Sequence, residues 1–395
     1  MVKLQKVLYI SKGFPRKGKQ SNYPFIGFKL AFLQKHGVHA DVLWIKKINF
    51  RNRNNFFRIA KYLALSIFPL IHFENNRFRD KKYSIYEINY TFLSRYWLPV
   101  IILILSKLKG YSLLHYHFLW SAGELVYLRK KLKLPAILSI RGSDMHEQAV
   151  NNPGLCSIYK SAIASADRII YVSEALRNCA KSIGLDTDKD IVINNGYDPE
   201  SFSLTYKNKD IPVFGFVGHL YHVKGVDKLP FIFKYIREQL PAAELLMVGG
   251  DSGKKKLSLK KVVIETFEEL GLKKYIKFAG EVLPYNMIEY YSKMDILFLP
   301  SRNEGFPNVV LEARACGVPV VGSNNGGIPE AIGSGGVIVP DGDDFERRFA
   351  AAAVKLYNNL PSRHVIHNEV APLTWDNVIL REISVYNKLL ENRTF

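Results

Sequence analysis

The sequence predicts an α/β protein made of two consecutive domains, each built on a doubly wound parallel β-sheet. Short apolar runs typical of buried strands alternate with helix-like segments through both halves of the chain. The 395 residues suffice for two domains of ordinary size, and a hydrophobic fraction of 48% is typical of a packed globular protein. A polar stretch with turn residues at 197–210 marks the expected join.

The first half of the chain alternates strand and helix patterns. Strands that are separated by helices run parallel and connect by right-handed crossovers, so they are expected to form one sheet. The first domain is therefore predicted to span residues 1–200. Its strands are expected at 6–10, 40–45, 113–117, 136–140, 166–172 and 192–196, and its helices at 24–35 and 121–132.

The second half repeats this alternation and predicts a second domain over residues 201–375. Strands are expected at 212–217, 244–248, 276–279, 296–300 and 318–321, and helices at 226–239, 259–270 and 285–293, with a short helix from about 308. A further helical pattern covers residues 375–390.

Composition limits the class of protein. The three cysteines, Cys156, Cys179 and Cys316, form no close pair, so a disulfide framework or a zinc site is not expected and a reducing compartment is favoured. The run 6–10 is too short for the apolar part of a secretory signal. The apolar runs 62–73 and 97–105 fall short of the roughly 20 residues of a membrane-spanning helix. We therefore expect a cytoplasmic protein.

The formal net charge of +19 includes a basic segment, residues 46–68, in which lysines and arginines interleave with aromatic and aliphatic side chains. Two interpretations stay open. The segment lies on an anionic surface, which would make the protein peripheral on the inner face of the cell membrane, or it is a core helix with a solvated basic edge. No nucleic-acid-binding motif accompanies the charge, so nucleic acid is not an expected partner.

Glu304 and Glu312, eight positions apart, are the first candidate site residues. Glu304 follows an apolar strand, and Pro307 suits the first turn of a helix that carries Glu312. Ligands bind at the carboxyl edge of an open α/β sheet, and two carboxylates beside a helix start suit a polyhydroxyl ligand with a phosphate. The alternative is a solvated loop acid and a helix-surface acid. For Glu312 this alternative is strained, because apolar residues surround it at 309–313.

The start of the second domain holds a candidate anion site. A strand ends at Val217, Gly218 permits a tight turn, and a helix follows Gly225. This arrangement places Lys224 where it can meet an anion. Taken alone, the pattern is more often that of an ordinary loop lysine.

Together these segments resemble the retaining glycosyltransferases of family 4, with a match over nearly the whole chain. Each matching sequence run is modest evidence alone, but the order and spacing of the runs together are specific to this family. The resemblance implies the GT-B fold, in which two Rossmann-like domains face each other across a cleft, and it assigns the C-terminal segment 376–395 to the first domain as a crossover helix. The runs are 141–144, 170–173, 192–198, 217–227, 280–282, 294–301, 303–313, 315–321 and 326–330.

The resemblance also implies residue roles. Glu304 contacts the donor sugar, Lys224 binds the phosphate, and Glu312 binds the ribose hydroxyls, since a carboxylate accepts from two neighbouring hydroxyls. Arg141 and His117 join Glu304 and Lys224 as candidate catalytic residues. The remaining donor-binding positions are Gly218, His219, Val282, Gly305, Phe306, Pro307, Asn308 and Val309, with Val282 at the nucleotide base.

Two positions depart from the family pattern. His219 stands where the family usually has an arginine on the diphosphate, and a neutral imidazole offers fewer donors than guanidinium. Arg141 stands where the family usually has a histidine close to the reacting sugar. Arg141 either clamps the phosphate in compensation or has a structural role, and both hypotheses stay open. For His115 or His117 taken alone, a hydrogen-bonded structural role is favoured.

The expected reaction moves a sugar from a nucleotide-diphosphate sugar, such as a UDP-sugar, to a hydroxyl of an acceptor glycan or lipid-linked sugar. Cell-surface polysaccharide or lipid-linked glycan synthesis would fit. We expect a front-face displacement with no cofactor and no metal, and the acidic run 341–344 is interpreted as a turn. The alternatives are an epimerase-like enzyme acting on sugar nucleotides with the same fold, and a non-catalytic, membrane-associated protein that binds nucleotide sugars.

Overall fold

The structure is a computed structural model, and its chain divides into two compact units. The first unit comprises Met1–Val172, Leu176–Ile193 and Ile379–Phe395, and the second comprises Ser173–Ala175 and Asn194–Val378. The structure describes residues 6–11, 24–47, 70–78, 81–90, 97–119, 134–142, 144–145, 153–207, 211–250 and 258–391, with the single positions 122 and 125.

The first unit contains an eight-stranded sheet in the order β3-β4-β2-β1-β5-β6-β7-β8. Neighbouring strands run parallel except for β3 and β4, which pair antiparallel. Two residues separate β3 from β4, a link that suits a hairpin but is far too short for a parallel crossover. The strands are β1 Lys6–Ser11, β2 His39–Lys47, β3 Leu70–Phe78, β4 Lys81–Tyr90, β5 Leu113–His117, β6 Ala136–Ile140, β7 Arg168–Tyr171 and β8 Asp190–Val192.

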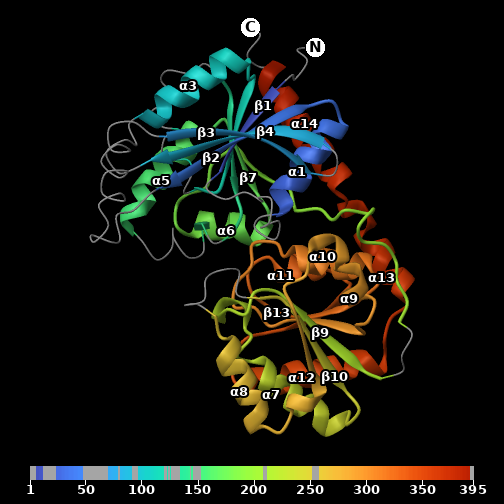
Figure 1. The fold of residues 1–395 in the computed structure, drawn as a ribbon. Helices are drawn as coiled ribbons and strands as arrows, with labels where there is room; N and C mark the ends of the chain where they lie inside the picture. Colours follow the sequence, from blue (N-terminus) through green and yellow to red (C-terminus); the bar gives the residue numbers. More distant parts are fainter. Residues whose placement is uncertain are drawn as a thin grey trace, which may run out of the picture. The chain divides into compact units, whose positions relative to one another are not determined.

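Helices pack around this sheet (Figure 1). The strands β5 and β6 are buried at every position, as expected of parallel strands that helices cover on both faces. The helices α1 and α14 lie side by side, and a buried ion pair joins Lys29 of α1 to Glu382 of α14. The helices are α1 Pro24–Lys35, α3 Leu98–Lys109, α5 Pro153–Ser165, α6 Glu174–Ser182 and α14 Trp375–Glu391.

The second unit contains a six-stranded parallel sheet in the order β11-β10-β9-β12-β13-β14. Its strands are β9 Val213–Val217, β10 Glu244–Val248, β11 Ile276–Gly280, β12 Ile296–Leu299, β13 Val320–Ser323 and β14 Gly336–Val339. Its helices are α7 Leu229–Gln239, α8 Lys260–Glu269, α9 Ile288–Tyr291, α10 Asn308–Ala315, α11 Ile328–Ile332, α12 Phe345–Asn358 and α13 Arg363–Val370.

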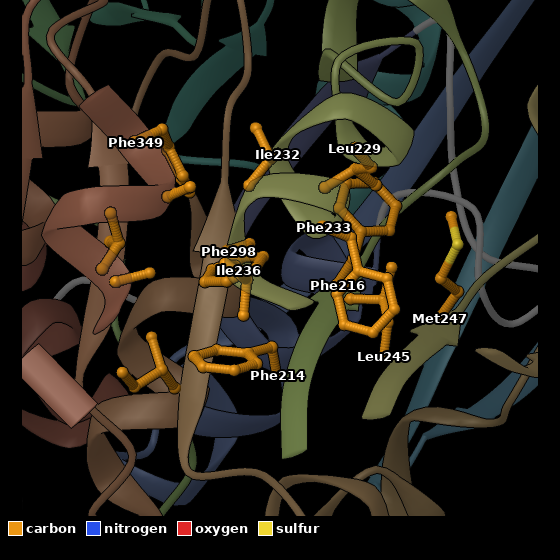
Figure 2. Close-up of a cluster of buried hydrophobic side chains, with 14 of the residues drawn as sticks. Phe214, Phe216, Leu229, Ile232, Phe233, Ile236, Leu245, Met247, Phe298 and Phe349 are labelled. Carbon is orange, nitrogen blue, oxygen red and sulfur yellow. The ribbon is translucent and has the colours of Figure 1, made fainter. Parts of the chain in front are cut away.

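A hydrophobic core on one face of this second sheet holds it against α7 and α12 (Figure 2). Phe214 and Phe298, from neighbouring strands, stack at 5.0 Å between ring centroids, and Phe349 of α12 meets Phe298 edge-on at 5.3 Å. Phe233 of α7 is fully buried in the same cluster. Burying each such side chain stabilises the unit by about 1.5–3 kcal/mol, so the core fixes the strand ends that carry the loops described below.

The strand order places β9 and β12 side by side at the centre of the second sheet. From β9 the chain builds outward through β10 and β11, and from β12 it builds in the other direction through β13 and β14. The sheet therefore has its topological switch point between β9 and β12, which is where open α/β sheets bind ligands.

The doubly wound α/β fold predicted from the sequence is confirmed. The bounds expected for the helix 24–35 and for the strands 113–117, 136–140 and 244–248 match those of α1, β5, β6 and β10. The hairpin β3–β4 was not predicted, because the sequence analysis expected only parallel strands.

The expected helix 285–293 is wrong in extent. Residues Pro284–Asn286 form a 3-10 turn and only Ile288–Tyr291 are α-helical. The helix expected at 226–239 begins later, at Leu229, with Pro230 in its first turn. The strand expected at 318–321 is displaced to Val320–Ser323, beyond Pro319, which has no N–H to donate.

Two expectations fall largely on parts of the chain outside the described residues. Most of the helix expected at 121–132 lies there, and so do residues 48–68 of the basic segment. The first two residues of the basic segment, Lys46 and Lys47, are the last two residues of β2. None of the helices that the structure describes is both long and apolar enough to cross a membrane.

Candidate functional site

An ion pair occupies the switch point of the second unit. Lys224 lies in a 3-10 turn, His222–Lys224, after β9, and Glu304 lies in the loop after β12. The Lys224 Nζ atom is 2.6 Å from Glu304 Oε1, and Ser301 Oγ donates to the same oxygen at 3.1 Å. The lysine side chain is 28% exposed and the glutamate side chain 13% exposed, so both groups remain open to a ligand.

The backbone holds this pair by close contacts that only glycine permits. Gly225 has φ 67°, and a Cβ there would strike the Pro300 carbonyl, so the Lys224 turn packs directly on the loop after β12. On the other side, Gly327 N–H donates to the Glu304 carbonyl at 2.9 Å. A Cβ on Gly327 would collide with the Gly305 carbonyl. Loops from β9, β12 and β13 therefore fix the Glu304 backbone.

The helix α10 begins directly beyond Glu304. Pro307 is its N-cap residue with extended backbone, ψ 116°, and Asn195 Nδ2 donates to the Phe306 carbonyl at 3.0 Å. Asn303 Oδ1 and Asn308 Oδ1 are buried and accept no hydrogen bond from any described residue. Buried acceptors without a partner are costly.

Glu312 lies one turn into α10, and its carboxylate meets a tyrosine. The Tyr291 hydroxyl, fully buried on α9, donates to Glu312 Oε2 at 2.8 Å. Burial raises the pKa of Glu312 to about 7, and the Tyr291 hydrogen bond acts in the opposite direction because it favours the ionised form. Near neutral pH the group is therefore present in both forms.

The remaining expected donor positions also follow strand ends in this unit. The Gly218 N–H donates to the Val248 carbonyl at 2.9 Å, which joins the ends of β9 and β10. His219 is half-buried, with its ring 5.4 Å from that of Tyr221. Val282 is half-buried and follows β11. Gly305 and Phe306 are buried, while Asn308 and Val309 begin α10.

The two first-domain candidates lie together in the first unit. His117 ends β5 and is fully buried, and its Nδ1 atom is 3.2 Å from Arg141 Nη2. The Arg141 guanidinium lies over the Phe25 ring at 5.2 Å. Burial lowers the pKa of His117, and the nearby His115 and Arg141 lower it further. Asp144 holds the loop by accepting backbone N–H groups of Leu119, Arg141 and Gly142.

His115 is part of a buried polar network that ties α14 to the first sheet. Its Nδ1 atom is 2.7 Å from the Tyr386 hydroxyl and its Nε2 atom 2.7 Å from Ser139 Oγ. The Tyr386 hydroxyl also bonds Tyr9 at 3.0 Å and donates to Glu382 at 3.2 Å. Burial lowers the pKa of His115 to about 3. The ring is thus neutral and hydrogen-bonded on both sides.

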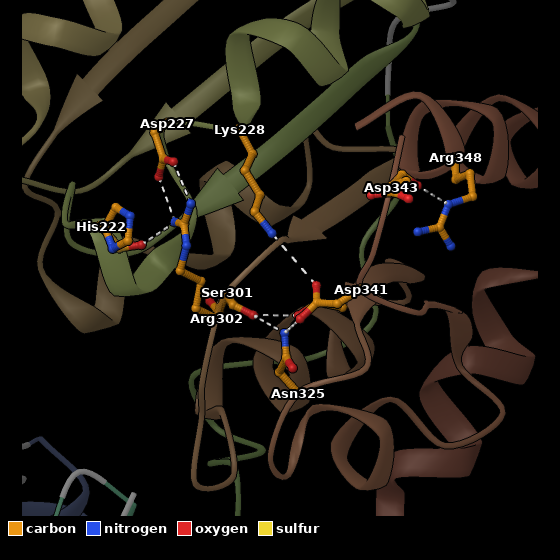
Figure 3. A network of polar contacts seen from close by, with 10 residues as sticks. His222, Asp227, Lys228, Ser301, Arg302, Asn325, Asp341, Asp343 and Arg348 are labelled. Carbon is orange, nitrogen blue, oxygen red and sulfur yellow. Dashed lines mark hydrogen bonds and ion pairs between the residues drawn. The ribbon is translucent and has the colours of Figure 1, made fainter. Parts of the chain in front are cut away.

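Sequence reasoning missed a second network beside the Lys224 turn (Figure 3). Arg302 forms a two-pronged ion pair with Asp227 and also reaches the His222 carbonyl. Asp341 accepts from Asn325 Nδ2 at 2.7 Å and lies 3.7 Å from Lys228 Nζ. For Arg302, Asn325 and Asp341 the available signal was a polar residue shortly after β12, β13 and β14, since such residues meet at one sheet edge.

Comparisons with known proteins place both units in one family. The family model described as Glycosyltransferase Family 4 matches residues 33–201, and the model described as Glycosyl transferases group 1 matches residues 211–359. The D-inositol 3-phosphate glycosyltransferases of Corynebacterium urealyticum and Corynebacterium jeikeium are each 28% identical to the chain. The first match covers 71% of this chain and 72% of the relative, and the second covers 60% and 61%.

Solved structures share the fold. Sucrose-phosphate synthase from Thermosynechococcus elongatus superposes with a TM-score of 0.73 at 20% identity, covering 98% of this chain and 100% of that one. Anabaena HepE in complex with UDP superposes with a TM-score of 0.68 at 17% identity, covering 97% and 100%.

Proposed function

This chain belongs to glycosyltransferase family 4 and is a glycosyltransferase of the GT-B fold, and we propose that it transfers a sugar from a nucleotide-diphosphate sugar to a hydroxyl acceptor with retention of configuration. The observation that carries the proposal is the Lys224–Glu304 ion pair at the switch point of the second sheet. At this point Lys224 offers a cation for a diphosphate and Glu304 offers a carboxylate for sugar hydroxyls. Both lie before the helix that carries Glu312.

In the proposed reaction the acceptor oxygen bonds to the anomeric carbon on the face from which the diphosphate departs. The bond from that carbon to the phosphate oxygen breaks, and the departing phosphate takes the proton of the acceptor hydroxyl. Lys224 and the start of α10 stabilise the growing diphosphate charge, while Glu304 holds the sugar. The chain's own residues supply these charges, and no metal or other cofactor takes part.

We propose a UDP-sugar as the donor. HepE, which shares the fold, is described in complex with UDP. Glu312 would receive the ribose hydroxyls, and backbone groups at Val282 would meet the base. Thermal unfolding in the presence of UDP, GDP and ADP tests this, because a ligand that binds only the native state raises its stability. We expect UDP to raise the midpoint most, and no shift with any of the three would refute a nucleotide site.

For the acceptor we propose a glycan or lipid-linked sugar of cell-surface synthesis, reached by a cytoplasmic protein at the inner face of the membrane. The helix α3 supports a membrane contact, because Trp97 precedes it and Ile104 and Leu108 lie on it, all exposed, beside the exposed Lys107 and Lys109. Sedimentation with vesicles of anionic or neutral lipid tests this. Binding only to anionic vesicles is expected, and no binding to either would refute the membrane contact.

A further inference from the structure

A clamp built from Arg302 and Asp227 surrounds the turn that carries Lys224. The Arg302 Nη1 atom donates to the His222 carbonyl at 2.6 Å and to Asp227 Oδ1 at 2.8 Å. Its Nη2 atom donates to Asp227 Oδ2 at 2.6 Å. The backbone N–H of Arg302 donates to the Val223 carbonyl at 2.8 Å. One arginine therefore holds both ends of the turn, His222 at its start and Asp227 just beyond Lys224 (Figure 3).

The geometry points to a positioning role for this clamp in the proposed reaction: Arg302, held by Asp227, fixes the Lys224 amine against Glu304 without touching the donor. Arg302 and Glu304 share the loop after β12, whereas Lys224 and Asp227 share the segment after β9. The clamp thus joins the loop that carries Glu304 to the segment that carries Lys224, and the proposed mechanism needs these two groups in a fixed relative position. This inference rests on the proposed function, since it concerns how Lys224 is presented to the diphosphate.

The chemistry of the pair suits positioning. A guanidinium binds a carboxylate with two parallel bonds in one plane, and Arg302 adds a bond to a carbonyl, so its orientation is fully set. Burial alone would raise the pKa of Asp227, but the hydrogen bonds from Arg302 lower it below its ordinary value. Both side chains are 31% exposed, so the pair by itself adds little stability. We expect the Arg302–Asp227 pair to act instead by fixing the geometry of the turn that carries Lys224.

The other side of the Glu304 loop is held separately. Ser323 Oγ donates to the Ser301 carbonyl at 2.5 Å, and Asn325 Nδ2 donates to the same carbonyl at 3.3 Å. Loss of the Arg302 side chain should therefore leave Glu304 in place and loosen the Lys224 turn, which keeps only the bond from the Arg302 backbone N–H to the Val223 carbonyl and the Gly225 contact with Pro300. A displacement of a reacting group by about 1 Å can cost up to roughly 100-fold in rate.

A double-mutant cycle on kcat/KM tests the role. We expect Lys224→Ala to lower kcat/KM about 100-fold and Arg302→Ala to lower it about 10-fold or more. If Arg302 acts through Lys224, adding Arg302→Ala to Lys224→Ala should cost less than about twofold further. A full multiplication of the two losses would overturn the inference. Wild-type kcat/KM in Arg302→Ala, with Lys224→Ala impaired, would overturn it alone and leave the proposed function standing.

Arg237 provides the matched control. It is a half-buried arginine of the same unit that donates to the Ala243 carbonyl at 3.1 Å and lies over the Tyr275 ring. Arg237→Ala should keep kcat/KM within about twofold of wild type, as expected for sites that do not interact. Thermal midpoints of both arginine variants separate activity from folding. Asp227→Asn should reproduce the loss seen in Arg302→Ala, and wild-type kcat/KM in Asp227→Asn would remove Asp227 from the clamp and overturn the inference.

Discussion

The pH dependence of donor binding is the sharpest consequence of the Glu312 environment. Ribose hydroxyls donate their hydrogens, so the carboxylate accepts both only when it is ionised. With a pKa of about 7 for Glu312, about 10% of the group is ionised at pH 6 and about 90% at pH 8. The donor KM should therefore fall about tenfold between pH 6 and pH 8.

Two groups beside Glu312 do not titrate in this pH range. Burial, the largest effect, raises the pKa of Tyr291 and of Cys316 above their ordinary values, so neither titrates between pH 6 and pH 8. Burial also lowers the pKa of Lys29, in the first unit, to about 7, so the Glu312→Gln variant is needed to assign the pH dependence to Glu312.

The assay is the initial rate against donor concentration at pH 6, 7 and 8 at constant ionic strength. The sugar nucleotide is used because the terminal phosphate of a free nucleotide titrates near pH ~6 and would confuse the profile. Glu312→Gln should have a raised donor KM with no pH dependence over this range. Tyr291→Phe removes a hydrogen bond that favours the ionised form, so its profile should move to higher pH. A flat wild-type profile, or an unchanged slope in Glu312→Gln, would refute the reasoning.

Four further predictions concern the reaction and the first unit. Glu304→Ala should lower kcat/KM by about 100-fold or more, as Lys224→Ala should, because each removes a partner of the transition state; wild-type turnover in either variant would refute its role. Activity should persist in EDTA, and a loss restored by Mg²⁺ would overturn the metal-free mechanism. Arg141→Ala should weaken donor affinity and turnover if the guanidinium clamps the phosphate, and unchanged kinetics would assign Arg141 a structural role. Glu382→Ala should lower the free energy of unfolding, by up to roughly 3–5 kcal/mol, since it leaves Lys29 buried without its counter-charge; burial lowers the pKa of Lys29 to about 7, so the loss should be larger at pH 6 than at pH 8, and denaturant unfolding showing a loss under about 1 kcal/mol at pH 6 would contradict it.

The sequence was most informative where the chemistry is local. Gly225, Pro307 and the apolar runs at 213–217 and 296–299 each act on their own backbone, so strand ends and the α10 start could be predicted without knowing the fold. Glu304 and Lys224 are 80 positions apart, yet they could be linked because both follow parallel strands whose carboxyl ends share one edge.

Side-chain partnerships across unrelated elements could not be predicted in this way. Tyr291 of α9 donates to Glu312 of α10, 21 positions further along the chain, and the sequence spacing gives no sign of that contact. Arg302 and Asp227 are 75 positions apart, and their pairing depends on how the loops after the neighbouring strands β12 and β9 lie against each other. Lys29 and Glu382 are 353 positions apart and meet where α14 packs on α1.

These missed contacts share a physical character that bears on the candidate site. Lys224 and Glu304, which are expected to meet the donor, are partly exposed, whereas Tyr291 is fully buried and Arg302 is engaged by protein atoms at both of its terminal nitrogens. Lys224 and Glu304 lie in loops that follow strands, so the local sequence pattern finds them. A group that sets the angle or the pKa of another group is chosen by packing, and packing is a property of the whole fold. The Arg302 and Tyr291 variants therefore test a different part of the proposal from the variants at Lys224 and Glu304: they ask whether the fold, and not only the residue type, prepares the site.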